Sequence, residues 1–279
     1  MDVHLSWNLV NDLRQLLEFH FMVNALRAGT IVAIVAGAIG YVMVIRRQSF
    51  AGHTLALLGF PGAAGAVWLG LDASVGFFGF CIAAAVLLGL APAGGSGQQS
   101  AAIGIVQSFG LACGLLFVSL YHGFLSGLNN LLFGTIVGVT DRQVLVLLIA
   151  GVVALVALAA LGRPLLFTSI DEAAARSRGV PTRLVGIAFL VLLGVAAAGA
   201  SQVTGSLLVF SLLVAPAATA VRLTARPVVG LVLSVAIALV VTWLGEGAAY
   251  FSPYPIGFWV TSFAFGLFLL ANGYRAVVK

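Results

Sequence analysis

Charged residues are scarce in this chain. Only 8% of its 279 residues are charged, whereas a soluble domain carries about 25%. So few charges cannot cover a globular surface with polar groups, but an apolar surface is well matched to lipid. The apolar runs are continuous and long, which excludes the alternating ten-residue segments typical of a membrane β-barrel. The composition therefore predicts an all-α polytopic membrane protein.

Lysine is almost absent, since Lys279 is the single lysine of the chain. The phosphate-binding loop G-x-x-x-x-G-K-[ST] requires a lysine, so the chain encodes no P-loop ATPase. The motifs H-E-x-x-H, G-x-S-x-G and C-x-x-C are also missing. These absences argue against an enzyme, and any ATP hydrolysis must come from another polypeptide. The two cysteines, Cys81 and Cys113, lie in apolar runs, where we expect packing residues rather than a disulfide.

Nine apolar runs approach the length of about 20 residues that crosses a hydrocarbon core. They cover roughly residues 22–45, 50–71, 74–93, 100–120, 143–162, 182–200, 204–222, 227–245 and 255–273. A shorter run, 127–139, predicts a re-entrant or interfacial helix. Leucines at helical spacing in residues 1–20 predict an amphipathic interfacial helix. We therefore expect this N-terminal helix and then one transmembrane domain, residues 21–275, with eight to nine spans.

The basic residues predict the orientation of the chain. If the first span ends in the cytoplasm at Arg46, alternation places ten of the 13 basic residues inside. These are Arg46, Arg47, Arg163, Arg176, Arg178, Arg183, Arg222, Arg226, Arg275 and Lys279. Cytoplasmic loops are enriched in Lys and Arg, so the N-terminus is expected outside and the C-terminus in the cytoplasm. The net charge of +5 is then a topology signal and does not indicate nucleic-acid binding.

Carboxylates are expected mainly on the outer side. Asp72, Asp141 and Glu246 are predicted to form an outer acidic rim that attracts cations. The alternative is that these loops simply carry polar residues to stay hydrated. We expect no Asp, Glu or Arg deep inside a span. That expectation argues against a secondary transporter acting alone, because such proteins use buried charged residues.

The longest inner loop, FTSIDEAAARSRGVPTR over residues 167–183, predicts a short cytoplasmic helix at about 170–180. Ser169 is expected to cap it, acidic residues lie in its first turn and basic residues in its last. Glycine followed by proline then ends it. The residues concerned are Asp171, Glu172, Arg176, Arg178 and Gly179. Such a helix is either a linker or a docking surface for a soluble partner.

Five segments share their order and spacing with a known family. They are RRQSFAGHTLALLGFPG from residue 46, LLFGTIVG, RPLLFTSIDEAAARSRGVP, SQVTGSLLVFSLLVAPAATA and YPIGFWVTSFAFGLFLL. Together they resemble the zinc/manganese-type ABC transporter permeases, the membrane subunits of metal importers, over residues 21–275. The resemblance implies a type II importer-like fold in a bacterial plasma membrane and no permanently bound cofactor.

The same resemblance implies several partners. The permease would form a homodimer, or a dimer of close paralogues, with the substrate pathway along the dimer axis in the lipid bilayer. Two ATP-binding subunits would dock from the cytoplasm, and the helix near residues 170–180 would be the segment that contacts them. An extracellular or periplasmic binding protein would deliver the substrate, a divalent metal ion.

The chain departs from the family pattern at the expected metal site. The family writes Phe-x-Gly-Asp-x-Leu-x-His, whereas here His53 stands at the Asp position and Leu57 at the His position. An imidazole contributes a lone pair without charge, so two copies of His53 across a dimer axis would favour zinc over manganese. Two alternatives stay open: His53 donates a hydrogen bond to a neighbouring helix and packs there, or the pathway carries a metal chelate. Gln107 and Gln202 are further pathway candidates, because an unpaired amide in a span is costly.

Overall fold

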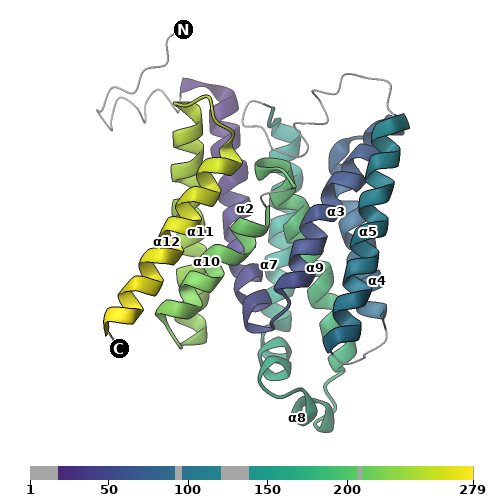
Figure 1. The fold of residues 1–279 in the computed structure, drawn as a ribbon, viewed down its shortest axis with the longest axis vertical. Coiled ribbons are helices and arrows are strands. Elements are labelled where there is room, and N and C mark those ends of the chain that lie inside the picture. The colour runs from purple at the N-terminus through teal and green to yellow at the C-terminus, as the bar shows by residue number, and fades with distance from the viewer. Residues whose placement is uncertain (1–17, 92–95, 121–137, 207–208, 279) are drawn as a thin grey trace.

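The computed structural model describes residues 18–91, 96–120, 138–206 and 209–278. The described residues form a bundle of helices that run alternately up and down, without strands (Figure 1). The helices are α2 (His20–Ile45), α3 (Ser49–Trp68), α4 (Ala73–Leu90), α5 (Ser96–Leu120), α7 (Asp141–Ile170), α8 (Glu172–Ser177), α9 (Thr182–Thr204), α10 (Val209–Leu223), α11 (Pro227–Tyr250) and α12 (Ile256–Val278). Eight of them are long and apolar enough to cross a membrane, which confirms the predicted polytopic fold.

The run predicted at residues 204–222 forms a shorter helix than a full span. α10 has 15 residues, which corresponds to ~22 Å of rise, less than the hydrocarbon thickness of about 30 Å. The turn before it lies inside the protein, since Gly205 and Ser206 are both buried. Gly205 has a φ of 78°, a left-handed conformation that glycine adopts without a steric penalty. Irregular backbone at membrane depth is tolerated only where protein covers it, as here.

α2 is the central helix of the bundle. It packs against α7, α9, α10 and α11. In its most apolar stretch of 18 residues, 72% of the residues are buried inside the bundle. Its buried positions are mostly small, including Ala28, Ala33, Ala36 and Gly40. Small residues let helix backbones approach closely in lipid. At Gly40 the approach is closest, because a methyl group there would overlap the backbone carbonyl oxygen of Leu213 on α10.

A second close approach joins α3 and α4. Gly62 of α3 and Gly76 of α4 face each other, and a methyl group on either would overlap the backbone carbonyl of the other. Behind this crossing, the buried thiol of Cys81 donates a hydrogen bond to the carbonyl of Leu55, 3.3 Å away. Both Cys81 and Cys113 are free thiols, as predicted.

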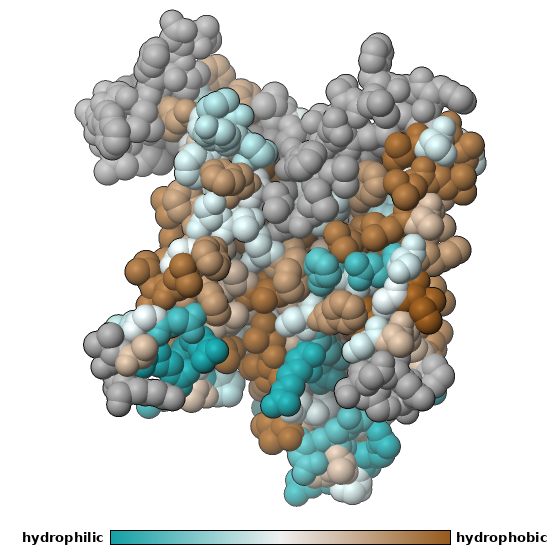
Figure 2. Space-filling model, viewed as in Figure 1, coloured by the Kyte–Doolittle hydropathy of each residue, from teal (hydrophilic) through white to brown (hydrophobic). Residues whose placement is uncertain are grey.

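Polar residues concentrate at the end of the bundle that carries α8. Figure 2 shows hydrophilic residues gathered there and under α10, α11 and α12, with a smaller hydrophilic patch at mid-height near α3 and α5. This end contains the last turns of α2, α7 and α10 and the first turns of α3 and α11 (Figure 1). The helices predicted within residues 1–20 and 127–139 fall almost wholly outside the described residues.

Candidate functional site

His53 lies one turn into α3, where it is half-buried. Its ring packs edge-on against Phe210 of α10, with 4.8 Å between the ring centroids. The buried Nδ1 atom has no hydrogen-bond partner among the described residues. Leu57, one turn further along α3, is also half-buried. The imidazole therefore packs against α10, and its buried Nδ1 atom could bind a ligand.

Gln107 and Gln202 each join two helices. The Gln107 side-chain oxygen on α5 accepts a 2.9 Å hydrogen bond from the hydroxyl of Thr54 on α3. The Gln202 oxygen on α9 accepts a 2.8 Å bond from the hydroxyl of Ser74 on α4. Both amides were chosen as pathway candidates because an unpaired amide would be costly. Their observed partners remove that reason.

The described residues of one copy do not form a complete metal site. Among the residues that the structure describes, no group of three or more His, Cys, Asp or Glu side chains could hold a metal ion. Zinc sites in proteins ordinarily take three or four protein ligands. Within the described part of one copy, His53 is thus not accompanied by enough ligands for such a site.

Two carboxylates of the predicted acidic rim lie exposed at the end opposite α8 (Figure 1). Asp72 caps α4 by accepting a 2.8 Å hydrogen bond from the backbone N–H of Ser74. Asp141 accepts a 2.9 Å bond from the amide of Asn24, and its Oδ1 lies 3.7 Å from Nε2 of His20. Each carboxylate thus has a local structural role.

Glu246, the third carboxylate predicted for the rim, is instead fully buried, with 0% of its surface exposed. The prediction was wrong because the apolar run ended at residue 245, whereas α11 continues to Tyr250. The side chain packs against Gly29 of α2, where the missing Cβ leaves room for the carboxyl group. Neither carboxyl oxygen has a hydrogen-bond partner among the described residues, nor does the hydroxyl of Thr242 one turn earlier. An acidic residue therefore lies buried within a spanning helix, one turn before the end of α11.

A short capped helix is present where the sequence predicted one. α8 spans Glu172–Ser177, and Glu172 and Arg176 form an exposed ion pair at 2.9 Å. Arg178 caps the carboxyl end and lies over the ring of Phe167, 5.7 Å from its centroid. Gly179 ends the helix with a φ of 80°, as expected of a glycine that follows a helix.

The amino-terminal cap of α8 differs from the prediction. Asp171 is the cap, because its carboxylate accepts a 2.9 Å hydrogen bond from the backbone N–H of Ala174. Ser169, the predicted cap, still belongs to α7 and donates to the carbonyl of Leu165. α7 continues through Ile170, so only Asp171 separates it from the first residue of α8. The two helices are thus joined almost directly.

Arg46 ties the end of α2 to the end of α7. Its Nη1 atom donates to the Leu165 carbonyl at 3.3 Å, to the Thr168 hydroxyl at 2.8 Å and to the Ser169 hydroxyl at 3.2 Å. The guanidinium also lies over the ring of Phe189 on α9, 5.4 Å from its centroid. Burial lowers the pKa of Arg46 and the negative charge of Glu172 opposes that shift. The contacts fix the segment from which α8 projects.

Arg47, the neighbouring arginine, has a different role. It is exposed and adopts a φ of 57°. Its backbone N–H bonds to the carbonyl of Val44, and that of Gln48 bonds to the carbonyl of Met43. This is the hydrogen-bond pattern in which a left-handed residue closes a helix. Arg46 therefore connects three helices, whereas Arg47 ends one.

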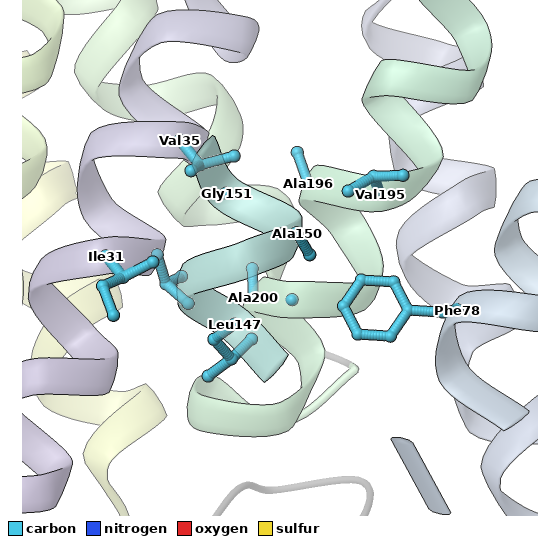
Figure 3. Close-up of a pocket in the computed structure, with 11 residues that line it drawn as sticks. Ile31, Val35, Phe78, Leu147, Ala150, Gly151, Val195, Ala196 and Ala200 are labelled. Atoms are coloured by element: carbon cyan, nitrogen blue, oxygen red, sulfur yellow. The ribbon is translucent and has the colours of Figure 1, made fainter. Parts of the chain in front are cut away.

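A small apolar cavity lies between α2, α7 and α9, away from His53 (Figure 3). Ile31, Val35, Phe78, Leu147 and Ala196 are among its lining residues, and its volume is about 10 Å³. A space of that size holds at most one water, and an apolar lining offers water no partners. The cavity is a packing gap and not a substrate site.

Comparison with known proteins decides the class of transporter. Residues 18–275 match the family described as ABC-3, the ABC 3 transport family. The chain belongs to this family. Membership confirms the resemblance to metal ABC transporter permeases and identifies a multi-pass membrane permease of the bacterial metal-importer type.

Individual relatives cover most of the chain. The manganese import system permease protein ScaB of Streptococcus parasanguinis is 33% identical over 203 residues, which are 73% of this chain and 72% of the relative. The chelated iron transport system membrane protein YfeC of Yersinia pestis is 32% identical over 242 residues, 87% and 81% of the two chains. The solved structure of PsaBC from Streptococcus pneumoniae in complex with Fab matches with a TM-score of 0.84 and 29% identity, covering 94% and 95%.

Proposed function

We propose that this permease moves a divalent transition-metal ion into the cell, driven by a separate ATPase subunit. The family assignment supports an importer, and the lack of a P-loop means that the chain needs an ATP-hydrolysing partner. Two copies, or one copy and a paralogue, enclose the pathway. A binding protein on the outer side delivers the substrate.

α8 is proposed as the contact with the ATPase. It projects from the α8 end of the bundle (Figure 1), and its exposed face carries Asp171, Glu172, Arg176 and Arg178. Basic residues gathered at that end support a cytoplasmic location by the positive-inside rule. On this orientation the exposed carboxylates Asp72 and Asp141 face the outside, where the delivered cation arrives.

The free Nδ1 atom of His53 is the observation that carries the metal proposal. Two such imidazoles, one from each copy, supply neutral nitrogen ligands. Nitrogen ligands suit zinc, copper or nickel, whereas manganese prefers oxygen. We therefore propose a zinc-like ion as the substrate, although several relatives are named for manganese.

A metal chelate is the second candidate substrate. Within the described residues one copy offers no group of three ligands, and Leu57 replaces the family's histidine. A chelate brings its own ligands, so the pathway would not need them. The relative YfeC is named for chelated iron transport, which favours this alternative over an organic solute.

Co-expression with the ATPase of the same operon would test the function. The purified complex is reconstituted in liposomes. Uptake of radioactive zinc, manganese and a ferric chelate is then compared with and without ATP on the side of the membrane that the ATPase subunits face. ATP-dependent uptake of a metal is the expected result. Flux through the lone chain that follows an ion gradient, without a co-purifying ATPase, would refute the proposal.

His53→Ala is expected to lower uptake of the free metal ion by about tenfold or more, because a lost ligand weakens metal binding. The measurement is the initial uptake rate in the same liposomes. His20→Ala, a change at the opposite end of the bundle, is the matched control and should transport normally. Unchanged kinetics in His53→Ala would remove the residue from the pathway. Loss of ion uptake with intact chelate uptake would instead show that only the free ion depends on the imidazole of His53.

A further inference from the structure

A groove runs along the outside of the bundle between α7 and α11. Both helices pack against α2, yet in the described part of the chain they make at most marginal contact with each other. The groove between them has a volume of about 290 Å³. α2 forms its floor, and the lining consists of Ala38, Tyr41, Val42, Leu155, Leu158, Ala159, Gly162, Leu165, Leu166, Pro227, Val228 and Leu231.

The lining is apolar throughout. Tyr41 is its single residue with a polar side-chain group, and the hydroxyl is turned onto Gly230 of α11, where a methyl group would overlap it. Val228 is 75% exposed and Leu166 38% exposed, so the walls open toward the surroundings of the bundle. In a membrane those surroundings are lipid acyl chains, which are the most abundant apolar molecules that could enter the groove.

The length of the groove matches one leaflet of a bilayer. On α7 it extends from Leu155 to Leu166, a rise of ~16 Å at about 1.5 Å per residue. Half of a hydrocarbon core of about 30 Å is ~15 Å. The groove also lies at the α8 end, since it includes the last turns of α7 and the first turn of α11 (Figure 1). One acyl chain of that leaflet therefore fits its length.

Each wall carries an arginine at the end where a lipid headgroup would lie. Arg163 adjoins the lining residue Gly162 and lies one turn beyond the lining residue Ala159 on α7. Arg226 directly precedes Pro227, the first lining residue of α11. Both arginines are exposed. Long basic side chains near helix ends extend toward the headgroup region.

We propose that this groove is a binding site for an anionic phospholipid. One acyl chain occupies the groove over α2, and Arg163 and Arg226 bind the phosphate from either side. Basic sites between transmembrane helices are suited to anionic headgroups, and guanidinium groups match phosphate geometry. The bound lipid fills the gap between α7 and α11, so it links the helix that leads into α8 to the opposite part of the bundle.

Native mass spectrometry of the full-length chain in detergent tests the site. The protein is incubated with dioleoyl phosphatidylglycerol or dioleoyl phosphatidylcholine, which share acyl chains and differ in charge. Each arginine near a membrane surface favours an anionic lipid about fivefold, so two give a preference on the order of 30-fold. The double variant Arg163→Gln/Arg226→Gln is expected to lose that preference. Arg142→Gln, an exposed arginine at the other end, should keep it.

A second pair of variants tests the apolar part of the site. Ala159→Phe puts a ring into the groove and should displace both lipids, whereas Ala160→Phe, on the adjacent exposed position outside the lining, should displace neither. Thermal melting verifies that each variant is folded. Equal retention of the two lipids by the wild type, or unchanged preference in the double variant, would overturn the proposal. The proposal would also be overturned if the protein formed a lipid-free dimer that Ala159→Phe dissociates, because the groove would then bind a second copy of the chain.

Discussion

Gly76→Ala is expected to destabilise the bundle strongly, because the new methyl group would overlap the carbonyl of Gly62 and approach the Cβ of Ala66 to 2.7 Å. Backbone atoms cannot rotate away, so α3 and α4 must separate. Overpacking of this kind costs about 1–3 kcal/mol. The melting temperature of the detergent-purified protein should fall, and so should the yield of monodisperse protein in size-exclusion chromatography.

Gly79→Ala provides the matched control, since it lies one turn further along the same helix. A methyl group there has no neighbouring atom within 4 Å. Alanine favours a helix over glycine by up to about 1 kcal/mol, so this variant should melt at or above the wild-type temperature. If Gly76→Ala melted together with Gly79→Ala, the close crossing of α3 and α4 would not be a determinant of stability.

Arg46→Ala is expected to separate ATP hydrolysis from transport. The change removes three hydrogen bonds to the end of α7 and the stacking on Phe189. Hydrogen bonds that involve a charged group are each worth about 1.5–3 kcal/mol. Without them the segment before α8 is no longer fixed to α2, so movement of α8 by the ATPase should not reach the spans. Metal uptake should fall at least tenfold while the reconstituted complex still hydrolyses ATP.

Arg47→Ala is the matched control for Arg46→Ala, because it removes the same charge at the adjacent position. Arg47 is exposed, and alanine tolerates the left-handed turn about as poorly as arginine does. Uptake and hydrolysis should both stay near wild type. The readout that separates coupling from folding is the ratio of uptake to hydrolysis. A parallel loss of both rates in Arg46→Ala, together with a lower melting temperature, would show that Arg46 only stabilises the fold.

The spans could be predicted because hydropathy is a property of the residues themselves. The limits of α2 and α3 followed from apolar runs broken by Arg46 and Arg47. α8 could be predicted from local signals, because acidic residues lie in its first turn, basic residues lie in its last turn and Gly179 follows its end. Ser169 was chosen as the cap because serine suits that role, but the sequence alone does not reveal that α7 continues past it.

The interior contacts were beyond the reach of the sequence. Glu246 was placed on a surface because an acidic residue ends an apolar run, and nothing in the pattern indicated that Gly29, far away in sequence, makes space for it. The partners of Gln107 and Gln202 are also distant, as Thr54 and Ser74 lie on other helices. The short α10 was read as a full span because its composition is apolar, while its length depends on where the chain turns at Gly205.

The shortness of α10 affects how the protein is made. A segment of 15 residues lacks the length that an isolated span needs to remain in a bilayer, about 20 residues. The preceding turn at Gly205 and Ser206 is buried. We therefore expect α10 to enter the bilayer together with α9, and to be retained there by its packing against α2, α11 and α12.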